Sequence, residues 1–319
     1  MSDALVSPAV AAVAAAAAVA LVAVGVRKVS RSNNERNMIP IMGVMGAFVF
    51  AAQMLNFALP GTGSSGHIVG GILLAAVLGP WAAYLTLTSV LLLQALVFAD
   101  GGLMALGCNI FNMGAMACLV AYPLVFRPIV RKGARIGRIM LASVLASTLG
   151  LVLGASAVTF ETELSGITAL PTIGFLGFMV PIHIVIGILE GVATGAVLSF
   201  VWRAKPDLIE AAADTNPGGR SLNRVLAVIL LSALLAGGAL SLAASSDPDG
   251  LEWSIERVAG TAELEAPATE AHEIAAKVQD STALMPDYER TSLAGIVGCG
   301  VIVLAAAGVA TLRRSRRRR

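Results

Sequence analysis

Long apolar runs recur along the whole of this 319-residue chain. Hydrophobic residues make up 57% of the sequence and charged residues 13%, whereas about 25% of the residues in a typical soluble domain are charged. A helix needs about 20 apolar residues to cross the hydrocarbon layer of a membrane. The composition therefore predicts an all-α membrane protein. Its nine apolar segments lie at residues 8–26, 38–59, 67–79, 82–98, 103–126, 138–160, 172–201, 224–244 and 293–312.

The third segment, 67–79, is short for a membrane span, and the sequence GPW at 79–81 predicts a turn after it. Lys and Arg residues decide whether it counts as a span, because short loops rich in them face the cytoplasm. Basic groups follow the first, fifth, seventh and ninth segments, and they share one side only if all nine segments cross. We therefore expect a cell-membrane protein with its N-terminus outside and its C-terminus in the cytoplasm. The basic groups are Arg27, Lys28, Arg31 and Arg36; Arg127, Arg131, Lys132, Arg135 and Arg138; Arg203, Lys205 and Arg220; and the run RRSRRRR at 313–319.

The nine segments divide into a seven-helix body, residues 1–201, and a two-helix C-terminal module, residues 224–319. A polar cytoplasmic linker, residues 202–223, joins them, and the loop 245–292 inside the module faces outside. Residues 244–292 hold eleven acidic and three basic side chains, a net charge of −8, while the rest of the chain carries +10. The first segment is expected to remain as a helix rather than be cleaved as a signal peptide, because basic residues follow it instead of preceding it.

The glycine-rich sequence GTGSSGH at 61–67 has only a superficial likeness to a phosphate-binding loop. Such a loop reads GxxxxGK[ST] after a strand, whereas this one lacks the lysine and lies between predicted helices. No such motif occurs elsewhere, and the HExxH motif of zinc proteases is absent too, so we expect no enzymatic activity in this chain. The spacing of Cys108, Cys118 and Cys299 fits neither a zinc site nor a disulfide framework, and we expect small buried side chains.

His67, in that glycine-rich loop, is one of only three histidines. A lone histidine more often makes a local hydrogen bond than binds a ligand, but other polar residues lie near the same outer end of the predicted spans. If they meet His67, they form either a ligand site or a network of hydrogen bonds between helices. Imidazole is a common ligand for nickel, cobalt, copper and zinc, although one histidine needs further ligands. The polar residues are Gln53 and Asn56, Gln94 and Asp100, and Asn109 and Asn112.

The other two histidines have different contexts. His183 and Glu190 stand seven residues apart, on one face of the seventh segment. They form either a polar relay in the bundle or a packed polar pair. His272 lies in the acidic loop and is expected to be solvated.

Five sequence blocks carry a resemblance to a known family. Together and in this order they resemble the CbiM/NikM family, the substrate-capturing membrane subunits of energy-coupling-factor transporters for cobalt and nickel. The sequence SSDPDGLEWSIERVAG at 245–260 resembles the small companion subunit CbiN/NikN, here fused to the same chain. The five blocks are MGVMGAFVFAAQMLNF at 42–57, GTGSSGH at 61–67, VLGPW at 77–81, FADGGLMALGCNIFNMG at 98–114 and HIVIGILEG at 183–191.

This resemblance implies that the chain captures Ni²⁺ or Co²⁺ as a substrate and carries no prosthetic group. It also implies partners, namely a CbiQ/NikQ-like transmembrane coupling subunit and two CbiO/NikO-like ATPase subunits, in a lipid membrane and without nucleic acid. The alternatives are a capture subunit for an organic, vitamin-like micronutrient and a membrane protein with a polar cluster that binds no metal. The sequence does not distinguish nickel from cobalt.

The resemblance further implies a flat, nitrogen-rich metal site near the outer face. Its ligands are the free N-terminal amine, a backbone amide, the imidazole of a histidine at the second position and the histidine of the SGH loop. His67 matches the last ligand, and Met1 stands at the start of the chain. Square-planar nitrogen ligation suits nickel or cobalt and disfavours magnesium. We expect a set of polar side chains to orient the ligands through hydrogen bonds: Gln53, Asn56, Asn109 and Asn112.

The first residues depart from the family pattern. Family members begin Met-His, whereas this chain begins MSDALVSP. Some members resemble Met-His-Met-Ser-Asp-Ala-Leu, so Met1 corresponds to their third residue. Either two residues precede Met1 in the natural protein, or the chain lacks one histidine ligand and binds metal weakly or not at all. The codons upstream of Met1, or the intact mass of the native protein, distinguish these hypotheses.

The acidic loop 245–292 is expected to lie over the metal site. Its charge either attracts cations by long-range steering or is that of an ordinary solvated loop.

Overall fold

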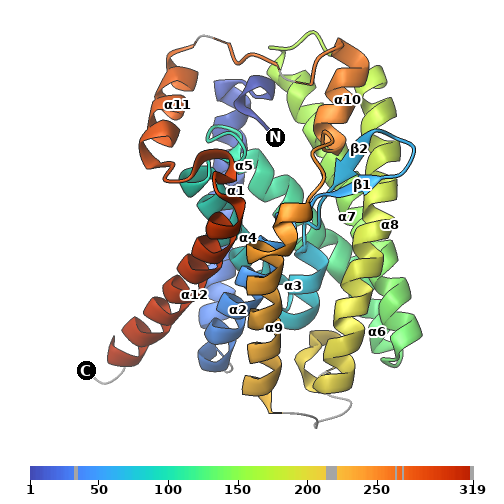
Figure 1. Cartoon of the computed structure of the whole chain (residues 1–319), viewed down its shortest axis with the longest axis vertical. Helices are drawn as coiled ribbons and strands as arrows, with labels where there is room; N and C mark the ends of the chain where they lie inside the picture. The colour runs from blue at the N-terminus through green and yellow to red at the C-terminus, as the bar shows by residue number, and fades with distance from the viewer. Residues whose placement is uncertain (32–34, 213–220, 263, 268, 317–319) are drawn as a thin grey trace.

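The computed structural model describes residues 1–31, 35–212, 221–262, 264–267 and 269–316. Within these ranges the chain is a bundle of helices with a two-stranded hairpin near one end (Figure 1). The long helices are α1 (Pro8–Ser30), α2 (Glu35–Gln53), α4 (Pro80–Val97), α7 (Ile136–Ser165), α8 (Thr172–Ala204), α9 (Leu222–Gly238) and α12 (Thr291–Arg316). Between α4 and α7, α5 (Leu106–Asn109), the π-wound segment η2 (Ile110–Phe126) and α6 (Arg127–Arg131) form one continuous helix.

Of the described helices, six are long and apolar enough to cross a membrane: α1, α4, the continuous helix Leu106–Arg131, α7, α8 and α12. The apolar parts of α2 and α9, Met38–Gln53 and Leu222–Gly238, are shorter. Large apolar side chains on the outer faces of these helices are not covered by other parts of the protein. This is expected of residues that face lipid. The expected helical membrane protein is therefore confirmed, whereas the number of crossings and their direction stay predictions.

The third apolar segment, 67–79, is helical only in its second part, and whether it crosses the membrane stays a prediction. Only α3 (Gly71–Leu78) is helical, and its eight residues reach about 12 Å at 1.5 Å per residue. The chain enters it from an antiparallel hairpin of β1 (Phe57–Leu59) and β2 (Ser64–Gly66). Protein surrounds α3, and six of its eight residues have apolar side chains that are buried. Burial in the protein core therefore accounts for its apolar sequence. Hydropathy does not separate a core helix from a lipid-facing one.

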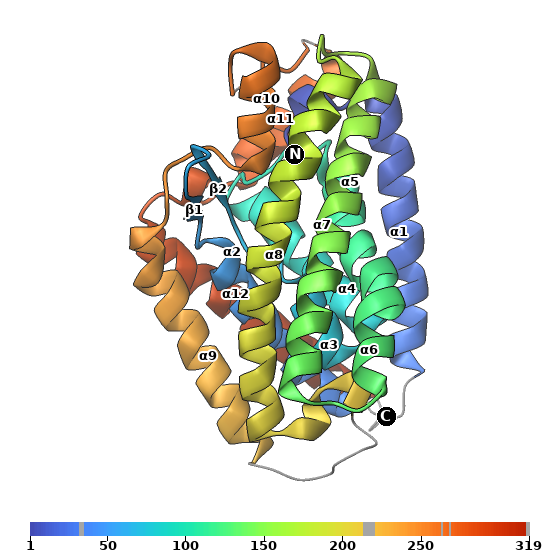
Figure 2. The ribbon, with the colours of Figure 1, turned by 90° about the vertical axis from the view of Figure 1, so that its right-hand side faces the viewer.

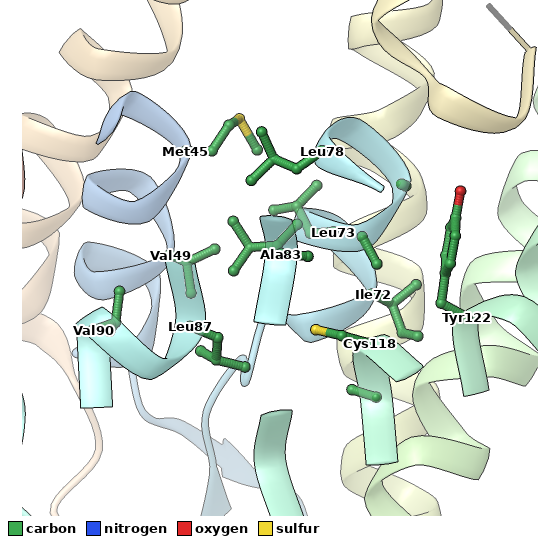
Figure 3. Packing of buried hydrophobic residues seen from close by; sticks show 14 of the residues in the cluster. Met45, Val49, Ile72, Leu73, Leu78, Ala83, Leu87, Val90, Cys118 and Tyr122 are labelled. Atoms are coloured by element: carbon green, nitrogen blue, oxygen red, sulfur yellow. The ribbon is translucent and has the colours of Figure 1, made fainter. Parts of the chain in front are cut away.

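The main hydrophobic core surrounds α3. Figure 3 shows Ile72 and Leu73 among Val49 of α2, Leu87 of α4 and Cys118 of η2. All of these side chains are fully buried. The three cysteines, Cys108, Cys118 and Cys299, are free and buried, as predicted. This core holds α3, through which the chain passes from the hairpin to α4.

The C-terminal module packs on one side of the body. Helices α9 and α12 both pack against α2, and they touch each other where Gly237 meets Gly295. A Cβ atom on Gly237 would lie only 3.1 Å from the Gly295 Cα atom, so neither glycine has room for a side chain. Between them the chain folds back over the N-terminal end of the bundle as α10 (Gly250–Ala259) and α11 (Glu270–Thr282), as Figures 1 and 2 show.

The ends of α1 and α8 and the turn between α6 and α7 lie at the opposite end of the bundle (Figure 2). Three of the four predicted basic groups therefore share one end, as the loop argument requires. Arg220, the side chain of Arg36 and the side chains of the arginine run at 313–319 lie outside the described residues. At the same end, two short turns of the linker, η3 (Pro206–Leu208) and η4 (Glu210–Ala212), are held by an ion pair of 2.7 Å between Arg127 and Glu210.

Candidate functional site

A cavity of about 120 Å³ lies near the N-terminal end of the bundle. Segments far apart in the sequence line it: the first residue, the end of the hairpin, η2, α7, α8 and the start of α10. Met1 and His67, which the sequence predicts to meet, both line this cavity. Most of the remaining wall is apolar. The polar or sulfur-bearing side chains in the lining are Met1, His67, Asn109, Asn112, Met113, Met179, His183 and Asp249.

The hairpin that carries His67 is shaped by its small residues. Its turn contains Gly61 and Gly63, both with positive φ, and Ser64 and Ser65 are completely buried. At Gly66 a Cβ atom would lie 2.9 Å from the Ile186 Cγ1 atom, so only glycine lets the strand lie this close to α8. The half-buried His67 follows directly at the wall of the cavity.

Val69 and Gly70, two and three residues after His67, are fastened by polar side chains from α8 and α2. The Glu190 carboxylate accepts hydrogen bonds from the backbone N–H groups of Val69 and Gly70, each at 3.1 Å. Gln53 donates its side-chain amide to the Val69 carbonyl at 2.9 Å. Both Gln53 and Glu190 are buried, and neither lines the cavity. They hold the His67 loop through its backbone, so Glu190 is bonded to this loop rather than to His183.

The start of the chain is anchored on the loop and helix that follow α4. The Met1 carbonyl accepts hydrogen bonds from the Gly102 N–H at 3.1 Å and from the Asn109 side-chain amide at 3.2 Å. The Asp3 carboxylate accepts one from the Ala105 N–H at 2.8 Å. The short turn η1 (Asp3–Leu5) then leads into α1. Asn109 therefore holds the first residue through its backbone carbonyl, while its role in orienting metal ligands stays a prediction.

A half-buried carboxylate that we did not single out from the sequence, Glu161, stands behind Asn112. Asn112 donates its amide to Glu161 at 2.7 Å, and its Oδ1 atom has no hydrogen-bond partner among the described residues. The sixth apolar segment was predicted to end at residue 160, but α7 continues to Ser165. Glu161 is thus on a helix, seven residues beyond the cavity-lining Gly154.

The C-terminal module contributes to the cavity wall through its PDGLE sequence, residues 248–252. The backbone N–H of Ser65 donates to the Pro248 carbonyl at 2.7 Å, and the Ser65 hydroxyl donates to the Asp247 carbonyl at 2.8 Å. The Trp253 indole donates to the Thr62 carbonyl at 3.0 Å. These bonds attach the module directly to the loop that carries His67.

Asp249 is the N-cap of α10, and it forms a reciprocal capping box with Glu252. Its carboxylate accepts from the N–H groups of Leu251 at 2.8 Å and Glu252 at 2.9 Å, and the Glu252 carboxylate accepts from the Asp249 N–H at 3.1 Å. The cap fixes the first turn of α10, so that Asp249, Gly250 and Leu251 form part of the cavity wall.

His183 lies on the cavity wall beneath this turn. Its Nδ1 atom is 2.7 Å from the Met179 carbonyl, which only accepts, so Nδ1 carries the proton and donates. A Cβ atom on Gly250 would lie 3.1 Å from the His183 Cε1 atom. The cavity therefore brings together two imidazoles, His67 and His183, but the predicted relay between His183 and Glu190 has no contact to support it in the described residues.

Three other predicted polar residues do not line the cavity. Asn56 uses its backbone carbonyl to accept from the Ser245 N–H at 2.8 Å. Asp100 accepts a hydrogen bond from the Tyr288 hydroxyl, and Gln94 is buried near the same tyrosine. Burial and the neighbouring Asp100 carboxylate raise the pKa of the Tyr288 phenol well above its ordinary value. These residues attach the C-terminal module to the body, and their spacing gave no sign of that role.

His272 is not solvated, contrary to expectation. It is 5% exposed, and its ring contacts Thr269 on its own helix and the backbone of residues 3 and 6. Charge and composition identified the acidic loop as polar, but they gave no sign that α11 presents one face to the N-terminal segment.

The apolar helices and the small cavity near one end of the bundle define a multi-pass membrane protein with a mostly apolar cavity that a few polar side chains enter. Comparison with known families adds that residues 1–208 match the CbiM family, described as a cobalt uptake substrate-specific transmembrane region. The chain belongs to this family. Residues 223–315 match the PDGLE domain.

Named relatives agree with this assignment. A putative fused nickel transport protein NikMN of Archaeoglobus fulgidus is 34% identical over 293 residues, which cover 88% of each chain. A probable fused nickel transport protein LarMN of Lactiplantibacillus plantarum is 31% identical over 265 residues, 79% of this chain and 77% of the relative. A crystal structure of a truncated transition metal transporter is 33% identical, with a TM-score of 0.54, over 63% of this chain and 97% of that one. The family and these relatives are metal transport proteins rather than enzymes.

Proposed function

We propose that this chain captures Ni²⁺ or Co²⁺ outside the cell membrane and presents the ion for import by an energy-coupling-factor transporter. The observation that carries the proposal is that Met1 and His67 line one cavity, although 65 residues separate them in the sequence. The His67 imidazole and backbone nitrogens at the start of the chain are the proposed ligands. Nitrogen ligands suit nickel and cobalt and disfavour magnesium, which prefers six oxygens.

Side-chain chemistry around the cavity supports a site built partly from backbone nitrogens. Among the described residues, no three His, Cys, Asp or Glu side chains are grouped in a way that could hold a metal ion. Two sulfur-bearing side chains, Met113 and Met179, line the wall and suit a transition metal better than a hard cation. The carboxylates of Asp249 and Glu161, at and behind the wall, offset the charge of a divalent ion. Asn109 and Asn112 orient the surrounding groups.

The cavity favours a metal ion over an organic micronutrient. Its volume of about 120 Å³ is smaller than the roughly 300–1,000 Å³ of typical small-molecule pockets. None of its described lining residues is Phe, Tyr or Trp, so it offers no aromatic surface for stacking an organic ring. The two named relatives are nickel transport proteins, the family is described for cobalt uptake, and the ligand chemistry does not separate these two ions.

Energy for import comes from partners in this proposal. The sequence has no phosphate-binding motif of an ATPase, so a transmembrane coupling subunit and two ATPase subunits supply the energy. Residues 1–201 form the capture body, 202–223 the cytoplasmic linker, and 224–319 a module that covers the site from outside. The end of the bundle that holds the cavity faces out, and the end that holds the basic groups faces the cytoplasm.

Calorimetric titration of the purified full chain tests the proposal. We expect the wild type to bind Ni²⁺ and Co²⁺ but not Mg²⁺, and His67→Ala to bind both at least about 100-fold more weakly, since each ligand lost removes several kcal/mol. His67 makes no hydrogen bond to another described residue, so the thermal unfolding of the variant serves as a control for its fold. Equal binding of Ni²⁺ by a folded His67→Ala variant would refute the proposal.

A further inference from the structure

Helix α11 of the C-terminal module touches the N-terminal segment at a point distant from the PDGLE contact. The His272 Nε2 atom lies 3.2 Å from the Asp3 carbonyl and 3.2 Å from the Val6 carbonyl. Asp3 is the first residue of the turn η1, and Val6 is the residue that follows it. A single imidazole therefore bridges both ends of the turn that connects Met1 to α1.

The hydrogen bonds place a proton on Nε2 and fix the orientation of this ring. Both carbonyl oxygens can only accept, so Nε2 carries a proton and donates to them. On the other side, Nδ1 lies 2.6 Å from the Thr269 hydroxyl, and Thr269 is also the N-cap of α11, accepting from the His272 N–H. The cap of the helix thus sets the direction in which the imidazole points. Such oriented, buried hydrogen bonds are costly to lose.

A second side chain of α11 contacts the loop after α4, which also holds Met1. Gln279, two turns after His272 on the same face, donates its amide to the Gly101 carbonyl at 2.8 Å and to the Ala95 carbonyl at 3.0 Å. The next residue, Gly102, donates its N–H to the Met1 carbonyl. Through His272 and Gln279, α11 therefore contacts both the N-terminal turn and the loop on which Met1 rests.

We propose that His272 is a positioning residue for the amino-terminal half of the metal site, with Gln279 as its second support. This inference rests on the proposed function. The C-terminal module then acts on the two halves of the ligand set separately, because the PDGLE segment fastens the loop of His67 whereas α11 fastens the start of the chain. His272 contacts no ion itself and acts through the backbone of Asp3 and Val6.

The test uses the full chain with His272→Ala, His272→Gln and Gln279→Ala. The matched control is Lys277→Ala, because Lys277 is exposed on the same helix. Amide hydrogen exchange of Leu5 and Val6 in the metal-free protein reports the order of the N-terminal turn, and Ni²⁺ titration reports its consequence. Loss of this bridge should raise the exchange rate and weaken Ni²⁺ binding by about tenfold each.

We expect both effects in His272→Ala, partial recovery in His272→Gln because its amide still donates, and no change in Lys277→Ala. If His272→Ala fails to fold, Gln279→Ala carries the same expectation, since it loses two hydrogen bonds but no buried ring. Unchanged exchange, or faster exchange with unchanged Ni²⁺ binding, would overturn the inference. Because exchange is measured without metal, a wild type that binds no Ni²⁺ would refute the proposed function while the exchange result stands on its own.

Discussion

Replacing Glu190 by glutamine should loosen the loop that carries His67 while α8 stays in place. The carboxylate accepts one hydrogen bond from Val69 and one from Gly70, and its residue is 1% exposed. Glutamine has nearly the same shape but only one acceptor oxygen, so one buried backbone N–H would face an amide N–H₂ group. The variant therefore changes hydrogen bonding at the loop with little change in packing.

The expected magnitude follows from these two bonds. A hydrogen bond to a charged group contributes about 1.5–3 kcal/mol and a neutral one about 0.5–1.5 kcal/mol. Losing one bond and weakening the other should cost the ordered loop about 2–4 kcal/mol. About 1.4 kcal/mol corresponds to a factor of ten in an equilibrium constant. A cost of about 2–4 kcal/mol therefore lowers the fraction of protein with an ordered loop by no more than about 30- to 1,000-fold. Only protein with an ordered loop binds the metal in this account, so the apparent affinity falls together with that fraction. We expect the affinity for Ni²⁺ to fall by between about tenfold and 100-fold.

Calorimetric titration with Ni²⁺ measures this loss, and hydrogen exchange at Val69 and Gly70 shows whether the loop itself has loosened. Glu163→Gln is the matched control, because it removes the same charge from an exposed position at the end of α7. The reasoning would be wrong if Glu190→Gln bound Ni²⁺ as tightly as the control and protected both amides equally well.

Two further predictions concern the cover and the shape of the site. Deleting residues 247–290 should abolish metal uptake in cells while the seven-helix body stays folded, because the PDGLE contacts and α11 are lost together; unchanged uptake, measured with a radioactive nickel or cobalt isotope, would rule out a gating role for the loop. Gly66→Val should displace the strand from Ile186 at a cost of about 1–3 kcal/mol, seen as a lower thermal unfolding temperature and weaker Ni²⁺ binding, and a variant with wild-type values in both would show that the close approach at Gly66 is not required.

Hydropathy predicted the positions of the helices better than their roles. A membrane helix is recognised by its length and apolarity, and both signals are strong in α1, α7 and α8. The same signals did not show that the third apolar segment contains only the short helix α3, because burial in protein and burial in lipid select the same residues. The hairpin before it was missed, since three-residue strands built from Phe-Ala-Leu and Ser-Ser-Gly leave no alternating pattern long enough to detect.

The spacing of polar residues along the chain predicted the end of the bundle at which they lie, but not the residues that they contact. Asn109 and Asn112 do line the cavity, whereas Gln53 and Glu190 hold the backbone beside it. A separation of three or seven residues identifies a shared helix face, but the rotation of that face depends on how neighbouring helices pack. The contacts of His272 with Asp3 and Val6 join the two ends of the chain, and no local pattern encodes such a pairing.

The central claim is that a divalent transition metal binds to nitrogens from the start of the chain and from His67. X-ray absorption spectroscopy of the nickel-loaded full chain tests it most directly, because it reports the type, number and geometry of the ligands. The account predicts a four-coordinate, planar shell of nitrogens that includes an imidazole, and the loss of imidazole scattering in His67→Ala. A six-coordinate oxygen shell, or an imidazole signal that is unchanged in His67→Ala, would contradict it.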